Sequence, residues 1–233
     1  MSEAVTSTLA DQMSLVRVGG WRRGPLGRLL RHRGAVVGLI VLGALASAAI
    51  FAPQLAPFDP IIPSLRDRLG QPSATNLLGT DGLGRDILSR MLFGARYSLP
   101  VGLLSTGMSL LIGAPIGFLA GFYAASSRNW VDNVSMRIMD TILAFPSFLL
   151  ALMLVSALGP SLENAMIAVG IVGIPVFARL ARASTLATKE RDFVTAARVV
   201  GANDFRLILR HLLPNSVQPL IVQGTLGVAT AIL

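Results

Sequence analysis

The chain has 233 residues, of which 53% are hydrophobic and only 14% charged, and its mean hydropathy is +0.66. Soluble globular domains carry roughly 25% charged residues, so this composition excludes an ordinary soluble domain and predicts insertion into a lipid bilayer. The net charge of +8 would otherwise suggest a nucleic-acid partner. Here the basic residues lie in blocks beside apolar runs, where they orient a membrane protein. We therefore expect contact with lipid and none with nucleic acid.

The sequence also lacks the residues that several kinds of chemistry require. It has no cysteine, which excludes disulfides and thiolate sites. His32 and His211 are far apart and stand in no acidic cluster, so no metal site is expected. The only lysine, Lys189, is not part of a glycine-rich phosphate loop. We expect a protein that is not an enzyme and binds no cofactor; if ATP drives it, another subunit binds the ATP.

Long uncharged runs predict an all-α protein with five membrane-spanning helices, because a span needs about 20 apolar residues. A basic tail at residues 1–33 comes first, and residues 59–97 form a long polar segment after the first span. The five predicted spans are residues 34–58, 99–123, 141–158, 164–178 and 218–233. The last run ends at Leu233 with no polar tail behind it. We expect a shortened chain that lacks at least one further helix.

The distribution of basic residues predicts the orientation of these spans. The first 33 residues carry six arginines against two acids, which places the N-terminus in the cytoplasm. Alternation then places residues 59–97 outside, residues 126–140 inside as a loop, and residues 179–215 inside. The inner loop has seven Lys or Arg against three acids, in agreement, whereas the outer segment holds five arginines and departs from the rule. The first apolar run has 25 residues, longer than the roughly 7–15 of a signal peptide, so we expect it to be retained.

Small residues and prolines recur within the later spans. Gly113, Gly117 and Gly121 lie four residues apart, a spacing that predicts close packing against another helix. Each later span also contains a proline that is a candidate kink: Pro115, Pro146, Pro175 and Pro219. None of the spans contains a charge, which argues against a proton- or ion-coupled pump.

A charged island separates the last two spans, and its apolar residues follow a helical period. Gly201 divides it into two arms, Asn203 or Asp204 can cap the second arm, and Pro214 is expected to end it. The island therefore predicts helix, glycine turn and helix at the membrane face. An interfacial hairpin that merely links two spans is the alternative. The apolar residues of the two arms are Phe193, Ala196, Ala197 and Val200, then Phe205, Ile208, Leu209 and Leu212.

The same island resembles the "EAA" loop of the permeases of bacterial ATP-binding cassette (ABC) importers. That pattern is Glu-Ala-Ala, three residues, glycine, nine residues and a hydrophobic-Pro-Asn ending. Thr195 stands where the family has glutamate. The positions that match in register are Ala196, Ala197, Gly201, Pro214 and Asn215.

A second motif is independent of the first. Residues 78–90 read LGTDGLGRDILSR and residues 94–99 read GARYSL. They resemble the signature of the dipeptide/oligopeptide/nickel subgroup, in particular its C-type (DppC/OppC-like) permease. Gly79, Gly82 and Gly84 could also suggest a dinucleotide fingerprint, but that fingerprint needs a strand and a helix in a βαβ unit, which a membrane context does not provide.

The resemblance implies a MetI-like transmembrane fold of the type I importers over residues 98–233, with about six helices in the family. It implies a homologous second permease, two cytoplasmic ATPase subunits that bind ATP and Mg, and an extracytoplasmic solute-binding protein. The coupling loop would be residues 179–215, and the substrate a di- or oligopeptide or a solute such as nickel. The ATPase-contact residues would be Thr195, Ala196, Ala197, Gly201, Ala202, Asn203 and Asp204, with His211, Pro214 and Asn215 at the loop's end. The rival interpretation is an ATP-independent channel or secondary transporter; a membrane enzyme is disfavoured because no catalytic cluster lies in the spans.

Overall fold

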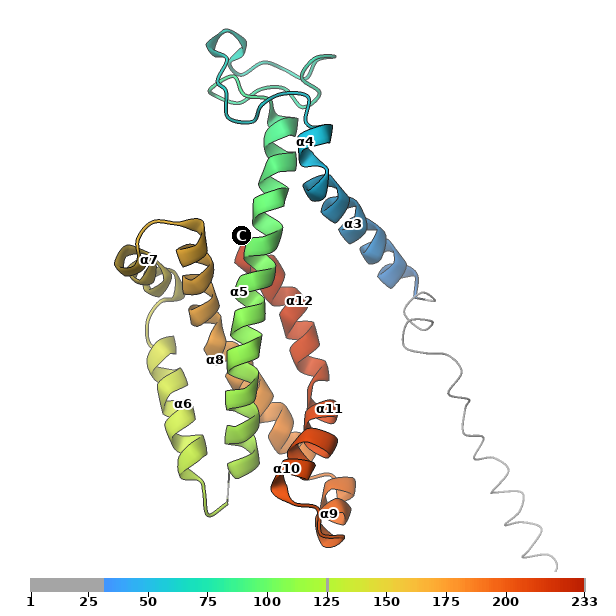
Figure 1. Cartoon of the computed structure of the whole chain (residues 1–233), viewed down its shortest axis with the longest axis vertical. Helices are drawn as coiled ribbons and strands as arrows, with labels where there is room; N and C mark the ends of the chain where they lie inside the picture. Colours follow the sequence, from blue (N-terminus) through green and yellow to red (C-terminus); the bar gives the residue numbers. More distant parts are fainter. Residues whose placement is uncertain (1–31, 125, 233) are drawn as a thin grey trace, which may run out of the picture.

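The computed structural model describes residues 32–124 and 126–232, which fold as a bundle of helices of very unequal length (Figure 1). Within these residues there is no β-strand, only an isolated antiparallel bridge between Thr80 and Asp86. The all-α prediction is confirmed. The predicted basic tail, residues 1–33, lies outside the described residues except for its last two positions.

The first helix, α3 (Arg33–Ile50), stands apart from the others and meets them only at its outer end, where the short α4 (Ala52–Leu55) follows (Figure 1). Its length and hydropathy suffice to cross a membrane, although it ends before the predicted boundary at residue 58. Most of its large apolar side chains are exposed in the isolated chain. This is the surface expected of a helix that faces lipid or another membrane subunit.

The central element is α5 (Ile87–Tyr123), a continuous helix of 37 residues that is longer than the predicted span at 99–123. It begins early because the Asp86 carboxylate accepts hydrogen bonds from the Ser89 backbone N–H and hydroxyl, both at 2.8 Å. Pro100 and Pro115 lie inside it without interrupting it. The helix therefore extends beyond its apolar part into the polar segment that precedes it.

The third predicted span, residues 141–158, is not one continuous helix. The structure has two helices here, α6 (Trp130–Leu143) and α7 (Ser147–Leu158), with an 88° bend between them. Pro146 explains the break, since proline lacks an N–H and disfavours helical geometry in the residue before it. Together the two helices could form one broken span.

The fourth predicted span corresponds to α8 (Leu162–Lys189), which has 28 residues and extends well past the predicted end at residue 178. The fifth corresponds to α12 (Gln218–Ile232), of 15 described residues. By length and composition, α3, α5 and α8 can each cross a membrane, and α6 with α7 could provide a fourth crossing. The count of five predicted spans is thus only approximated by the structure.

The glycines predicted to pack form the contact between α5 and α8. A Cβ atom built at Gly113 would lie 2.5 Å from the Ile174 carbonyl oxygen, and one at Gly121 would lie 2.8 Å from that of Arg182. A Cβ atom at Gly117 would collide with the carbonyl oxygen of Ala178, which lies one turn of α8 after Ile174 and one turn before Arg182. Only glycine permits such close approach of the two backbones.

Two serines that the sequence analysis did not single out extend this contact outward. The Ser105 hydroxyl donates to the Met166 carbonyl at 2.9 Å, and the Ser109 hydroxyl donates to the Gly170 carbonyl at 2.6 Å. Both pairs are 61 residues apart, as are the glycine pairs below them. The helices α5 and α8 are therefore parallel and keep one register throughout their contact.

Candidate functional site

The charged island folds as a compact hairpin at the lower end of α5 and α8 (Figure 1). Its first arm is α9 (Asp192–Val199). Its second arm is a continuous helical segment made of α10 (Asp204–Arg206), a π-helix, η2 (Leu207–Leu212), and α11 (Leu213–Ser216). The predicted order of helix, glycine turn and helix is confirmed.

Local chemistry accounts for the turn between the arms. Gly201 has φ of +90°, a left-handed conformation that glycine adopts without strain. The N–H of Ala202 donates to the Ala197 carbonyl and that of Gly201 to the Arg198 carbonyl, both at 3.0 Å, which together close the end of α9 in a Schellman motif. The Asn203 side chain then caps the second arm by accepting from the Arg206 N–H at 2.9 Å. Of the two candidate caps, the structure selects Asn203.

The prediction that the second arm ends at Pro214 is wrong. Helical structure continues to Ser216, and Pro214 stands in the first turn of α11, where its missing N–H costs little. The π-helix before it supplies the local change in winding. Asn215 reaches back, and its side-chain amide donates to the His211 carbonyl at 2.7 Å.

A small apolar core holds the two arms together and attaches them to α5. Val194 of the first arm meets Leu207 and Leu212 of the second, and all three pack on Phe122, next to the last residue of α5. Each of the four side chains is at most 5% exposed. Of the predicted contact residues, Ala197 and Ala202 lie against this core and serve the hairpin's own packing.

Several other apolar residues of the hairpin point outward. Val200 is 88% exposed and Phe205 is 73% exposed, and the small residues Thr195 and Ala196 are exposed beside them. Of the apolar stripe predicted for the first arm, Ala197 packs on this core, whereas Phe193, Ala196 and Val200 are exposed and Val194 packs in their place. The surface formed by these exposed residues, which we call the outer hairpin face, is defined by Phe193, Thr195, Ala196, Val199, Val200 and Phe205.

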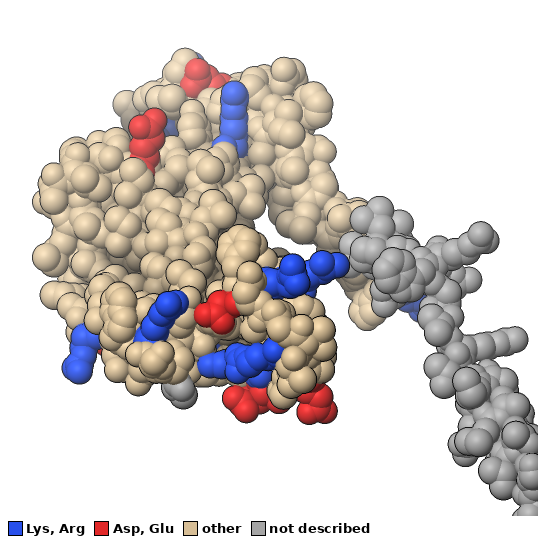
Figure 2. All heavy atoms as spheres, turned by 60° about the horizontal axis from the view of Figure 1, so that its bottom comes forward, with Lys and Arg blue, Asp and Glu red and all other residues tan. Residues whose placement is uncertain are grey.

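Charged side chains surround this end of the molecule. Figure 2, in which the lower end of Figure 1 comes forward, shows Lys, Arg, Asp and Glu side chains gathered at the two ends of the described bundle, with an almost uncharged flank between them. That distribution matches a membrane-embedded middle and two water-facing ends. The outer hairpin face is thus an apolar surface in an aqueous region, where such surfaces mark contacts with other proteins.

Two ion pairs that the sequence analysis missed fasten α6 to α8 near the same end. Asp132 is buried and receives a two-pronged contact from Arg182, with Nε and Nη2 at 2.5 and 2.7 Å from its two oxygens. Asp140 pairs with Arg179 at 2.5 Å, but both side chains are about half exposed. Residues 126–140 had been predicted to be an inner loop. They instead lie largely in α6, whose acids are neutralised by α8.

A cavity of about 560 Å³ lies higher in the bundle, between α5, the bend from α6 to α7, α8 and α12. Of the described residues that line it, none is charged. Phe148 lines the cavity and is 72% exposed, so the cavity opens to the outside of the chain along α7. Its polar lining consists of hydroxyl and amide side chains: Ser105, Thr106, Ser109, Ser147, Gln223 and Thr230.

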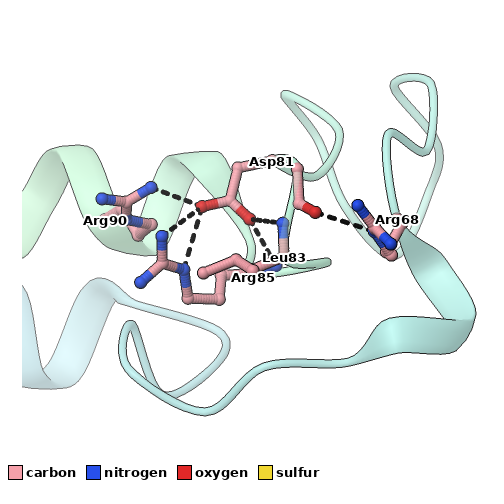
Figure 3. Close-up of polar contacts among 6 residues, drawn as sticks. Arg68, Asp81, Leu83, Arg85 and Arg90 are labelled. Atoms are coloured by element: carbon pink, nitrogen blue, oxygen red, sulfur yellow. Dashed lines mark hydrogen bonds and ion pairs between the residues drawn. The ribbon is translucent and has the colours of Figure 1, made fainter.

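The segment between α4 and α5 forms a cap on the far end of α5 and is organised around Asp81 (Figure 3). One oxygen of Asp81 accepts from the backbone N–H groups of Leu83 and Arg85 at 2.8 and 3.0 Å. The other accepts from the guanidinium groups of Arg85 and Arg90. Arg68 donates to the Gly82 carbonyl at 2.8 Å, which joins the two halves of the segment.

These contacts also set the charge state of the Asp81 side chain. Desolvation opposes ionisation, but hydrogen bonds from the Arg85 and Leu83 backbone, the hydrogen bond from the Arg85 side chain and its positive charge outweigh it. They hold the pKa of the Asp81 carboxyl well below its ordinary value.

Three of the five arginines of residues 59–97, namely Arg68, Arg85 and Arg90, therefore have a structural use, which accounts for their presence despite the orientation rule. Gly84, with φ of +75°, lets the loop pass the Ser64 backbone; a Cβ there would collide with it.

Within the described parts of the chain, no group of three His, Asp or Glu side chains is arranged to hold a metal ion. The features with a shape suited to function are therefore the outer hairpin face, the uncharged cavity and the Asp81 cap.

Comparisons with known proteins identify the family. A profile described as "Binding-protein-dependent transport system inner membrane component" matches residues 113–233, and one described as "N-terminal TM domain of oligopeptide transport permease C" matches residues 21–75. The chain is 44% identical over 216 residues to the dipeptide transport system permease protein DppC of Alkalihalophilus pseudofirmus, covering 93% of this chain and 69% of the relative.

Other relatives agree with this assignment. The di/tripeptide permease DppC of Pseudomonas aeruginosa is 46% identical over 209 residues, covering 87% of this chain and 67% of the relative. The glutathione transport system permease GsiD of Pectobacterium atrosepticum is 40% identical over 214 residues, covering 91% and 68%. With a multi-helix membrane architecture and both motifs in place, the chain belongs to the binding-protein-dependent transport system inner membrane components, as an ABC transporter permease of the dipeptide/oligopeptide/nickel subgroup.

Proposed function

We propose that the chain forms part of the pathway for di- or oligopeptides in an ATP-driven importer and couples to cytoplasmic ATPase subunits through its hairpin. The observation that carries this proposal is the outer hairpin face, an apolar and small-residue surface at a charged end of the molecule. Three of the relatives are named for dipeptides, di- and tripeptides and glutathione, which supports a short peptide over a nickel complex as the solute.

The division of labour within the hairpin supports contact with an ATPase. Its inner side is fully used to hold the two arms on α5, while Thr195, Ala196 and Val200 are left exposed. Small side chains let a partner approach the helix backbone closely, and an apolar centre with a polar surround is the usual composition of a protein contact. Thr195 stands where the family has a glutamate, so the proposed contact with the ATPase would depend on shape and apolar area instead of on a charge at this position.

The cavity supports a solute pathway. A short peptide carries charged ends and many amide groups, and a lining of hydroxyl, amide and aromatic groups offers it weak, exchangeable contacts. The absence of charge in the described lining also favours ATP as the source of energy over coupled protons or ions, which need intramembrane ionisable residues. We propose that a homologous second permease closes the exposed side of the cavity, and that a solute-binding protein delivers peptide at the Asp81 cap.

The proposal is tested with the full chain co-expressed with its second permease, ATPase subunits and binding protein. Ala196→Glu places a charge on the outer hairpin face, and we expect it to reduce co-purification of the ATPase subunits and uptake of a labelled dipeptide by about tenfold or more, as for a central interface residue. Ala196→Ser, which stays small, is the matched control and should retain both.

The same experiment distinguishes an ATP-driven importer from an ATP-independent channel or secondary transporter. Dipeptide uptake by the chain without any ATPase subunit would establish an ATP-independent transporter. Unchanged co-purification and uptake in the Ala196→Glu complex would show that the outer hairpin face is not the coupling surface.

A further inference from the structure

Lys189, the only lysine of the chain, ends α8 directly before the hairpin and points back to a different helix. Its Nζ donates to the carbonyl oxygens of Phe122 and Ala124, at 2.8 and 3.0 Å. These residues are 67 and 65 positions away, at the very end of α5. The lysine therefore joins the C-terminal ends of the two central helices.

The chemistry of the contact makes it a strong link between the two helix ends. The last carbonyls of a helix have no intrahelical donor and carry the negative end of the helix dipole. A single ammonium group satisfies two of them here, and it lies 5.8 Å from the centre of the Phe122 ring, within range of a cation–π attraction. Hydrogen bonds to a charged donor are stronger than those between neutral groups.

The Lys189 contact bears on how the hairpin is attached to the two central helices. The backbone links the hairpin directly to α8 through residues 190–191, but it has no short link to α5. Two contacts reach the end of α5 directly: the Phe122 core joins the hairpin to it, and Lys189 joins to it the end of α8 from which the hairpin emerges.

The far end of α5 is fixed in the same way to the Asp81 cap. The Ser89 hydroxyl accepts from the Phe58 N–H at 3.1 Å, and the Ile87 N–H donates to the Gly79 carbonyl at 3.1 Å. A single unbroken helix of 37 residues thus has the cap attached to one end and the hairpin to the other.

We propose that Lys189 is a positioning residue that fixes the base of the hairpin, at the end of α8, to the end of α5, so that a displacement of the hairpin moves α5 and the Asp81 cap with it. This inference rests on the proposed function and assigns the route by which movement at the ATPase side reaches the side where solute arrives. The outer hairpin face, which would contact the ATPase, is a different surface from the one that holds Lys189.

The test uses the complete transporter in proteoliposomes and measures dipeptide uptake per ATP hydrolysed in the presence of the binding protein. Lys189→Met removes both hydrogen bonds and keeps the stem, and we expect the ratio to fall about tenfold or more, since one charged hydrogen bond suffices for a change of that size. Lys189→Arg keeps a cation with several donors and should restore most of the ratio. Arg137→Met, which removes an exposed cation of α6, controls for the loss of charge and should leave the ratio unchanged.

Co-purification of the ATPase subunits is measured on the same complexes and should be the same for the wild-type chain and Lys189→Met. If Lys189→Met does not reach the membrane, Lys189→Gln, a shorter neutral donor, takes its place and should give a ratio between those of the Met variant and the wild-type chain.

A ratio equal to that of the wild-type chain in the Met or Gln variant would overturn the inference. So would an Arg variant as impaired as the Met variant, or loss of the ATPase subunits from the Met variant. Failure of the wild-type complex to bind ATPase subunits or to take up dipeptide would instead refute the proposed function.

Discussion

Replacing Gly117 with alanine tests whether α5 and α8 are held together by direct contact of their backbones. A Cβ atom at Gly117 would lie under 3.0 Å from the Ala178 carbonyl, and 2.7 Å from the Ala181 Cβ. Neither atom belongs to a flexible side chain that could turn away, so the two helices must separate. Overpacking of this kind costs about 1–3 kcal/mol, and a loss of that size lowers the ratio of folded to unfolded protein about 5- to 150-fold.

Gly107→Ala is the matched control, because Gly107 lies on the same helix and a Cβ there would meet no atom within 4 Å. Alanine is favoured over glycine inside a helix by roughly 0.5–1 kcal/mol, so the control should be as stable as the wild-type chain or more so. Stability is measured by pulse proteolysis of the detergent-solubilised full chain across an SDS titration. If Gly117→Ala unfolds at the same SDS concentration as Gly107→Ala, the backbone contact does not hold these helices.

Three further predictions concern the ion pairs, the Asp81 cap and the orientation in the membrane. Arg182→Met leaves Asp132 buried without its partner and should cost about 3–5 kcal/mol, whereas Arg179→Met, at a half-exposed pair, should cost about 0–1 kcal/mol; equal losses in the SDS titration would contradict the assignment. Asp81→Asn should speed tryptic cleavage of the cap at neutral pH. In the wild-type chain the pKa of the Asp81 carboxyl is lowered, so the stabilisation from its ionised form is fully present above the ordinary value of 3.8 and is lost progressively as the pH falls from there through the lowered pKa. The cap of the wild-type chain should therefore become sensitive to pepsin, a protease that is active in acid, only in that range. A cysteine at Ser73, in a chain that has none, should react with an impermeant thiol reagent in spheroplasts, and labelling only after lysis would reverse the topology.

The parts of the structure that the sequence predicts well are those decided by neighbouring residues. The turn at Gly201 and the cap at Asn203 depend on backbone geometry and a side chain three positions away. The glycine spacing on α5 is likewise visible in one helix alone. Ser105 and Ser109 continue that four-residue spacing and could have been found by extending it, since serine is also small.

Other features depend on partners that are distant in the sequence. Pro115 and Pro175 lie in unbroken helices, whereas the chain bends by 88° at Pro146. A proline breaks a membrane helix only where neighbouring groups fail to satisfy the freed carbonyls, and that is a property of the packed bundle. Asp132 lies in the segment predicted to be an inner loop, and its partner, Arg182, is 50 residues further on, so the ion pair that holds α6 against α8 is not visible in the local sequence. Lys189 gave no signal at all, because its acceptors are backbone carbonyls, which any sequence would provide.

The constant offset of 61 residues between α5 and α8 restricts how the protein can change shape. The contacts recur once per four residues, so the next matching register is one repeat away, a slide of about 6 Å at 1.5 Å per residue. A smaller slide would drive carbonyl oxygens of one helix into the neighbouring turn of the other. We therefore expect α5 and α8 to travel as a single rigid unit. The bend between α6 and α7, where the helical hydrogen bonding is already interrupted, is then the natural hinge around which the rest of the bundle can rearrange.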